Sequence, residues 1–167
     1  MAHSQVTIEG LDALLRRLRA FPAEMSKRGG PVRQGVQKGA AVIRDEAKNN
    51  IRGIVADPNI GGHDRSTGLL EKSVKAMRAR NSAKYKGETY FVTIPKSARY
   101  PVDSRTPSGV GVATVGKMLE YGTAKQSRKP WMAPAFHSKK DEAVRVMVET
   151  VLRGVERVER KLALTVR

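Results

Sequence analysis

The feature that most restricts the fold of this 167-residue chain is the apolar pattern near its C-terminus. From Pro134 onward, apolar residues repeat close to every 3.5 positions: Val144, Val148, Val151, Val155, Val158 and Leu162, with Met147 and Leu152 beside them. This spacing places them on one face of a long helix. Because the stripe is long for so small a protein, we expect part of it to cover a sheet and the remainder to meet a neighbouring subunit.

A second long helix is indicated after the break Gly29-Gly30-Pro31, because proline is favoured in the first turn of a helix. Its apolar stripe contains Val32, Val36, Gly39, Ala40, Ile43, Ala47 and Ile51. Several of its residues are small and would let another backbone approach closely. We interpret it as a core helix lying across a sheet rather than as a functional site.

The N-terminal region predicts a short arm over residues 1–8, followed by one amphipathic helix. Val6-Thr7-Ile8 are all β-branched, and Leu11, Leu14, Leu15 and Leu18 fall on one helix face.

The middle of the chain predicts a small antiparallel sheet. Residues 74–80 and 88–95 are the first two strands, joined by a hairpin loop over 81–87, and 110–113 forms a third, glycine-weakened strand. Residues 53–67 and 96–109 are long loops rich in turn-forming residues, and loops of this length are often functional. The whole chain, 1–167, therefore predicts a single α+β domain, with the small antiparallel sheet packed against a central helix and a long C-terminal helix.

The net charge of +16 constrains the kind of partner. Residues 65–105 carry 10 basic and 3 acidic side chains, so the excess is concentrated in the middle of the chain. Such a charge favours contact with DNA or with an acidic protein surface, although a solvated basic face that maintains solubility explains it about equally well. The candidates for DNA or acidic-partner contact alternate along the strand and hairpin: Lys72, Lys75, Arg78, Arg80, Lys84 and Lys86.

The residue types that carry catalysis and metal binding are poorly represented. Cysteine is absent, which excludes disulfides, thiolate nucleophiles and Cys-ligated zinc. The three histidines, His3, His63 and His137, have no partners at metal-ligand spacing. We expect no enzyme activity, no metal and no cofactor. No apolar run is long enough for a membrane span and no signal peptide is apparent, so we expect no membrane and assembly in the cytoplasm.

Three of the eight aromatic residues, Tyr121, Trp131 and Phe136, lie close together around one glycine and two prolines. Tyr121 precedes Gly122, where a positive φ would end a short helix, and Pro130 and Pro134 bracket the only tryptophan, Trp131. We expect the Glu120 carboxylate to bond the Gly-Thr turn rather than to act as a general base. Trp131 has two open interpretations, a core residue at the end of the sheet or an anchor between subunits.

The same residues carry a resemblance. Glu120-Tyr121-Gly122-Thr123, then Pro130-Trp131-Met132-Ala133-Pro134-Ala135-Phe136, resembles the signature of the tail-component family of long-tailed double-stranded DNA phages. The segments Ser66-Thr67-Gly68-Leu69-Leu70-Glu71-Lys72-Ser73 and Ile8-Glu9-Gly10-Leu11-Asp12-Ala13-Leu14 are similar to two further elements of that family. Its members resemble tail-completion or neck proteins, similar to the minor tail protein Z of phage lambda.

The resemblance implies a structural virion protein of the head–tail neck. Such proteins form rings, commonly hexamers, between the head connector or adaptor and the tail terminator or tube, with DNA passing through the lumen. A closed ring requires a heterologous contact. The residues we expect at the subunit or partner interface are Met118, Glu120, Tyr121, Gly122, Thr123, Trp131, Met132 and Phe136. The alternative is a basic nucleic-acid-binding module that acts outside a particle, although no helix-turn-helix, zinc finger or RNA-binding strand motif is present.

Overall fold

The computed structural model describes residues 25, 29–57, 67–80, 87–101 and 109–164. Its elements are helix α2 (Pro31–Ala56), the short helix α3 (Leu69–Ser73), strands β1 (Lys75–Arg78) and β2 (Tyr90–Thr93), helix α4 (Val112–Tyr121) and helix α5 (Met132–Leu164). The predicted arm over 1–8 and the predicted amphipathic helix at Leu11–Leu18 lie outside the described residues.

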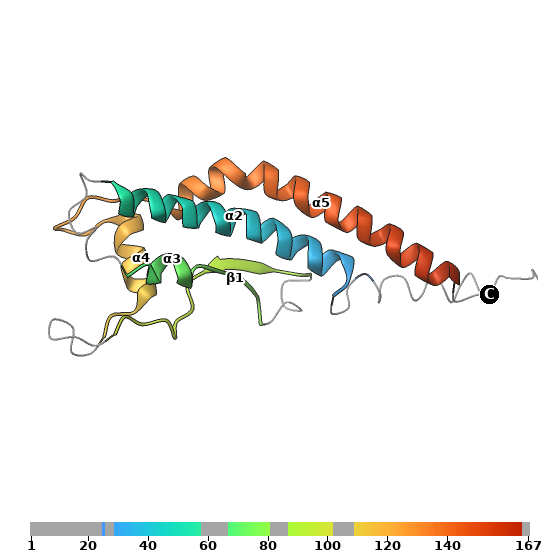
Figure 1. The fold of residues 1–167 in the computed structure, drawn as a ribbon, viewed down its shortest axis with the longest axis horizontal. Helices are drawn as coiled ribbons and strands as arrows, with labels where there is room; N and C mark the ends of the chain where they lie inside the picture. The colour runs from blue at the N-terminus through green and yellow to red at the C-terminus, as the bar shows by residue number, and fades with distance from the viewer. Residues whose placement is uncertain (1–24, 26–28, 58–66, 81–86, 102–108, 165–167) are drawn as a thin grey trace, which may run out of the picture.

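The elements form three layers (Figure 1). Helix α5 runs along one side of α2, and the hairpin of β1 and β2 lies on the other side of α2, while α3 and α4 lie together at one end of the hairpin. The predicted α+β class, with its small antiparallel sheet, central helix and long C-terminal helix, is confirmed. Because α2 is the middle layer, it receives side chains from both neighbours, and most of its residues are at least half-buried.

The contact between α2 and α5 depends on small residues. A Cβ added to Gly39 would lie 2.9 Å from the carbonyl oxygen of Ala143, and one added to Gly35 would lie 2.6 Å from a methyl of Val151. In the opposite direction, Gly154 of α5 lies against the ring of Pro31. The close approach expected from the small residues of α2 is therefore made to α5, and Gly154 marks a contact.

The apolar face of α5 differs from the predicted stripe. Ala143 and Val158 are buried and Met147 and Val151 are half-buried, so the face toward α2 follows these residues and Gly154. Val144, Val148 and Leu152 remain exposed. The sequence spacing located the helix correctly, but it merged two adjacent rows of apolar residues into one.

The hairpin pairs in the predicted antiparallel sense, with Ala76 opposite Val92 and Met77 opposite Phe91. Tyr90 and Val92 are half-buried on the side of α2, where the Arg33 Nε donates a hydrogen bond of 3.4 Å to the Tyr90 hydroxyl. Met77 and Phe91 are on the opposite face and are exposed. The loop residues 81–86 lie outside the described part of the chain.

The predicted third strand over 110–113 is wrong, because α4 begins at Val112. Gly111 alone pairs, in an isolated bridge with Arg99, and the Val112 N–H donates to the carbonyl of Ala98 before the helix begins. Val112 is fully buried as the first residue of α4. The sequence Val-Gly-Val-Ala is too short to separate a strand from the start of a helix.

The predicted start of the first long loop, at residue 53, is also wrong. Helix α2 continues through Gly53 to Ala56, because Ile54 and Val55 pack against the core. Residues 58–66 and 102–108 are outside the described structure. In the second loop, the Tyr100 N–H donates to the Val110 carbonyl, and this bond and the one from Val112 to Ala98 form the Arg99–Gly111 bridge.

The core joins these elements at one end of the molecule. Its buried residues come from α2, α3, the strands and their flanks, α4 and the start of α5: Ala47, Ile51, Leu70, Val74, Ile94, Val112, Trp131 and Ala135. Since the predicted interface segment contributes Trp131, the core and that segment meet at the junction of α4 and α5.

Candidate interaction site at the junction of α4 and α5

The end of α4 is fixed by Gly122. Its φ is +79°, a conformation that favours glycine, and its N–H donates to the Met118 carbonyl at 2.9 Å. A Cβ at this position would also lie 2.9 Å from the Arg128 nitrogen. The predicted positive φ at Gly122 is confirmed, and the close contact with the returning chain is a second reason for glycine here.

The chain then turns back on itself. The N–H of Thr123 donates to the Gln126 carbonyl at 2.9 Å, and the reverse bond measures 3.3 Å. The Lys129 N–H donates to the Leu119 carbonyl at 2.6 Å, which ties the incoming segment to the last turn of α4. The connection between the two helices is therefore a hydrogen-bonded corner.

Trp131 is a core residue of the single chain. It is 4% exposed, and its indole Nε1 donates a hydrogen bond of 2.9 Å to the carbonyl of Gly116. Gly116 is closely packed, since a Cβ there would lie 2.8 Å from the Cδ1 of Ile94 and 3.3 Å from the indole, and these side chains would have to shift. On the other side, the Asn50 amide donates to the Trp131 carbonyl at 3.0 Å. Of the two interpretations that the sequence left open for Trp131, the structure of the single chain agrees with the core residue.

Glu120 caps α5 from a different helix. One carboxylate oxygen accepts the N–H groups of Trp131 at 2.7 Å and Met132 at 2.8 Å, and the other accepts that of Ala133 at 3.0 Å. No acidic residue lies in the first turn of α5, so α4 supplies the negative charge that the helix N-terminus favours. The expectation that Glu120 bonds the Gly-Thr turn is wrong, because the N–H groups of Gly122 and Thr123 already donate to backbone carbonyls.

The outward surface of this junction is apolar. Tyr121 is 79% exposed, the highest value among the large apolar residues that the structure describes, and Phe136 and Met118 are also exposed. Thr123 is exposed, and Met132 and Gly122 are half-buried. All eight residues predicted for the interface therefore lie at the corner between α4 and α5. Trp131 and Glu120 stabilise this corner through their hydrogen bonds.

The basic residues predicted to contact DNA or an acidic partner do not form one continuous surface in the described part of the chain. Lys72, Lys75 and Arg80 are exposed, whereas Arg78 forms an ion pair with Glu88 at 2.6 Å. The guanidinium of Arg78 holds the pKa of the Glu88 carboxyl below its usual range. Lys84 and Lys86 lie outside the described residues. The strand register also places Lys75 and Arg78 on opposite faces of the hairpin, so they do not share one backbone-facing row.

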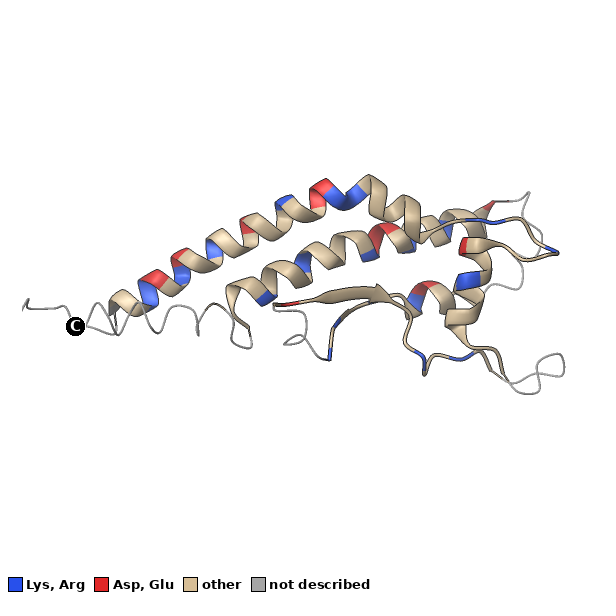
Figure 2. Cartoon of the chain, turned by 180° about the vertical axis from the view of Figure 1, so that it is seen from behind, with Lys and Arg blue, Asp and Glu red and all other residues tan. Residues whose placement is uncertain are grey.

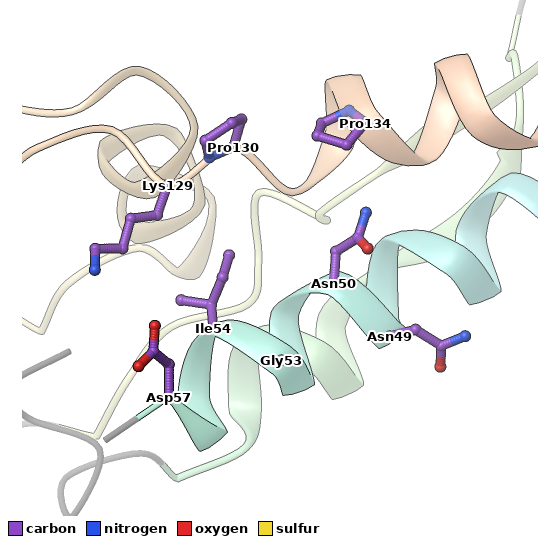
Figure 3. Close-up of a pocket in the computed structure, with 8 residues that line it drawn as sticks. All are labelled: Asn49, Asn50, Gly53, Ile54, Asp57, Lys129, Pro130 and Pro134. Atoms are coloured by element: carbon purple, nitrogen blue, oxygen red, sulfur yellow. The ribbon is translucent and has the colours of Figure 1, made fainter. Parts of the chain in front are cut away.

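Two hollows border the junction. A cavity of about 250 Å³ lies between β2 and α4 and is lined in part by Thr93, Tyr121 and Met132. A second, more open cleft of about 510 Å³ lies between the end of α2 and the segment before α5. Lys129 and Asp57 lie at one end of this cleft and Asn50 and Pro134 at the other (Figure 3).

A comparison with protein-family models gives a match over residues 12–122, to the model described as "Bacteriophage HK97-gp10, putative tail-component". The match covers more than half of the chain. The chain belongs to the HK97-gp10-like family of phage tail components. Within this tail component, the match ends at Gly122, so it includes Glu120 and Tyr121, while Trp131 and α5 lie beyond it. The comparisons with curated proteins and with solved structures returned no match. The expected similarity to the lambda minor tail protein Z is therefore not shown.

Two further properties concern the part of the chain that the structure describes. No group of three or more His, Asp or Glu side chains is arranged to hold a metal ion there. None of the described helices is both long and apolar enough to cross a membrane.

Sequence reasoning missed two residues of the junction. Gly116 is signalled only by being a glycine inside a helix, which costs about 1 kcal/mol against alanine and so indicates a packing reason. Asn50 is one polar residue among many on α2, and nothing in its sequence context identifies it as the partner of Trp131.

Proposed function

We propose that this tail component is a structural protein of the head–tail neck. In this proposal, copies of the chain form a ring, with six as the expected number, between the head connector and the tail terminator or tube. DNA passes through the lumen, and the protein is built into the virion after synthesis in the host cytoplasm. The whole chain acts as one domain with a structural rather than a catalytic role.

The observation that carries the proposal is the rigid corner at Tyr121. The side chain follows the last turn of α4, and that turn is held by Gly122 and by the return of the chain at Lys129. Because the backbone that carries it is already fixed, covering this large aromatic side chain, which is 79% exposed, costs little backbone freedom. Tyr121, Met118 and Phe136 therefore supply the contact with a neighbouring subunit or an adjoining virion protein, while Trp131 holds their support in place.

The net charge of +16 supports a place beside DNA or an acidic partner ring. Lys72, Lys75 and Arg80 are exposed, and within the described residues they form no ion pair. They remain available to phosphates in a lumen or to carboxylates of an adjoining protein. Arg78 is less suited to this role because Glu88 already binds it.

The test is to locate the chain in purified particles. Cryo-electron microscopy of particles that contain it should place a ring of copies at the junction of head and tail. Tyr121→Ala should fold normally and lower incorporation at least tenfold, because the exposed ring is lost and the core is unchanged. Tyr121→Phe is the matched control and should be incorporated. A position in the tail tip, or a single copy per particle, would contradict the proposal.

A second candidate function is a nucleic-acid-binding module outside a particle, which the exposed Lys72, Lys75 and Arg80 favour. Duplex affinity of the purified chain should then fall steeply with salt, with Lys75→Glu weakening it for all sequences alike. Weak duplex binding by a chain that enters particles would favour the neck protein instead.

A further inference from the structure

Helix α5 has an apolar row on the side that α2 does not cover. Val144, Val148 and Leu152 follow one another at four-residue intervals and are 52%, 47% and 57% exposed. Extended in both directions, the same face contains Asp141, Val155 and Glu159, since these follow at spacings of three or four residues. We call these six residues the outer row of α5. Its apolar centre is about 12 Å long at the rise of an α-helix.

The outer row is also where the carboxylates without partners lie. In the described part of the chain, the other acidic side chains make an ion pair or hydrogen bond or have another interaction, for example Glu71 with Arg52 and Glu149 with Arg153. Asp141, Glu156 and Glu159 have no such bond there. Asp141 and Glu159 end the outer row, and Glu156 is beside it (Figure 2 shows the acidic residues of α5). An apolar centre with charged ends resembles the core and rim of a protein interface.

A complementary surface lies on the opposite side of the molecule. The hairpin face turned away from α2 contains Lys75, Met77, Phe91 and Thr93, and we call it the outer sheet face. Met77 is 42% exposed and Phe91 48% exposed, and Lys75 lies beside them. Four residues of strand span about 10 Å between the first and last, close to the length of the apolar centre on α5.

The charges on the two surfaces are of opposite sign. The described residues 67–101 contain Lys72, Lys75, Arg78, Arg80, Lys96 and Arg99 against Glu71 and Glu88, and both of those carboxylates are already paired with arginines. The outer sheet face therefore contains the exposed cation Lys75 and no carboxylate, whereas the outer row of α5 ends in carboxylates with no partner in the described chain. The sheet face can therefore supply a cation to the carboxylates of the outer row, which have no ion pair in the described residues.

We infer that the outer row of α5 of one copy packs on the outer sheet face of the next copy. This inference rests on the proposed ring and names its subunit contact. Because α5 and the hairpin lie on opposite sides of α2, the two surfaces belong to different parts of each copy, as a heterologous, head-to-tail contact requires (Figure 1). A helix laid over the hairpin would cover the face of the sheet that α2 leaves open.

The acceptor surface also continues toward Tyr121. Thr93 of the outer sheet face and Tyr121 of the junction line the same cavity of about 250 Å³. A helix lying along the hairpin of the next copy would extend over this cavity. The contact on the sheet and the contact at Tyr121 are thus parts of one surface.

The absence of cysteine makes the test direct. Met77→Cys and Val148→Cys are made separately and together, and a short bis-maleimide is added to the concentrated purified chain and to particles that contain it. Mixing the two single variants should give a cross-linked dimer. The double variant should give a ladder of oligomers on a denaturing gel, and neither single variant should cross-link alone. Val144→Cys, one helical turn away, should behave like Val148→Cys.

The matched control is the double variant Met77→Cys with Arg157→Cys. Arg157 is exposed on the same helix but lies half a turn around it from Val148, so no ladder should form. Circular dichroism checks that each variant is folded. Cross-linking by Val148→Cys alone would show a symmetric helix pair and would overturn the inference, as would a chain that enters particles without any ladder.

The outcomes separate the inference from the proposed function. A chain located at the neck without cross-links between positions 77 and 148 would leave the neck proposal standing and reject this contact. A ladder in the purified chain together with a position elsewhere in the particle would support this contact and reject the neck proposal. Loss of cross-linking on removal of residues 1–24 would show that this segment shapes the surface and would also count against a contact made by the two faces alone.

Discussion

At the scale of single residues, Glu120 is the side chain whose contacts do most for the candidate site. Three consecutive N–H groups at the start of α5 donate to its carboxylate, and no acidic residue of α5 could replace it in the first turn. The sequence predicted that this carboxylate would have a structural role at a helix end. It could not predict which helix, because the bond joins residues 11 to 13 positions apart across a turn.

Glu120→Gln tests this cap. Gln keeps the size of the side chain but has one acceptor oxygen and no charge, so we expect the free energy of unfolding to fall by about 1–2 kcal/mol. The measurement is urea denaturation at neutral pH. Glu149→Gln is the control, because it removes an exposed charge that pairs only with Arg153 on the same helix and should change stability by less than about 0.5 kcal/mol. Equal losses in the two variants would contradict the capping role.

At the scale of elements, the structure depends on how closely α2 and α5 approach. The small residues of α2 were visible in the sequence, and they predicted a close backbone contact. The sequence did not show that α5 is the partner in this contact, because the apolar residues of α5 were interpreted as a single row. Val144 and Val151 are both apolar, but Val151 packs on Gly35 and Val144 is exposed. Periodicity locates an apolar face only to within the width of the stripe.

A pair of glycines in α2 tests this contact. Gly39→Ala places a Cβ 2.9 Å from the Ala143 carbonyl oxygen, so α5 must shift, and we expect a loss of about 1–3 kcal/mol. Gly53→Ala, in the same helix, meets nothing within 4 Å and should raise stability by up to about 1 kcal/mol. Thermal unfolding followed by circular dichroism measures both. A stabilising Gly39→Ala would mean that the two helices are further apart than described.

The hairpin predicts a pH dependence. Arg78 lowers the pKa of the Glu88 carboxyl, so the ion pair stabilises the fold fully above the ordinary glutamate pKa of about 4.3 and is lost as the pH falls below it. Glu88→Gln should therefore lower Tm at pH 7 and reduce the further drop in Tm on acidification. Glu156→Gln, at an exposed carboxylate with no ion pair in the described residues, should leave that drop as in the wild type. An unchanged acid limb in Glu88→Gln would contradict the role of this pair.

At the scale of the whole molecule, the α+β class and the order of the main elements followed from the sequence. The order of the layers could not be predicted from the sequence. Periodicity shows that a helix face is apolar, but it does not show which element covers that face. The long last helix was expected to cover the sheet in part. In the structure α2 lies between them, so α5 keeps one side free (Figure 1). The same uncertainty applied to Trp131, whose burial depends on Gly116 and Asn50 from two other helices.

The capped junction has a mechanical consequence. Helix α5 has 33 residues and is about 48 Å long, and Gly35, Gly39 and Gly154 hold it against α2, so the two helices form a stiff rod attached at the Glu120 corner. Because the corner is rigid, a rotation of the whole subunit by about 10° about it would displace the far tip of the rod by about 8 Å. In the proposed ring, a small rotation at the contact made by Tyr121 would therefore become a larger displacement at the opposite tip of each subunit.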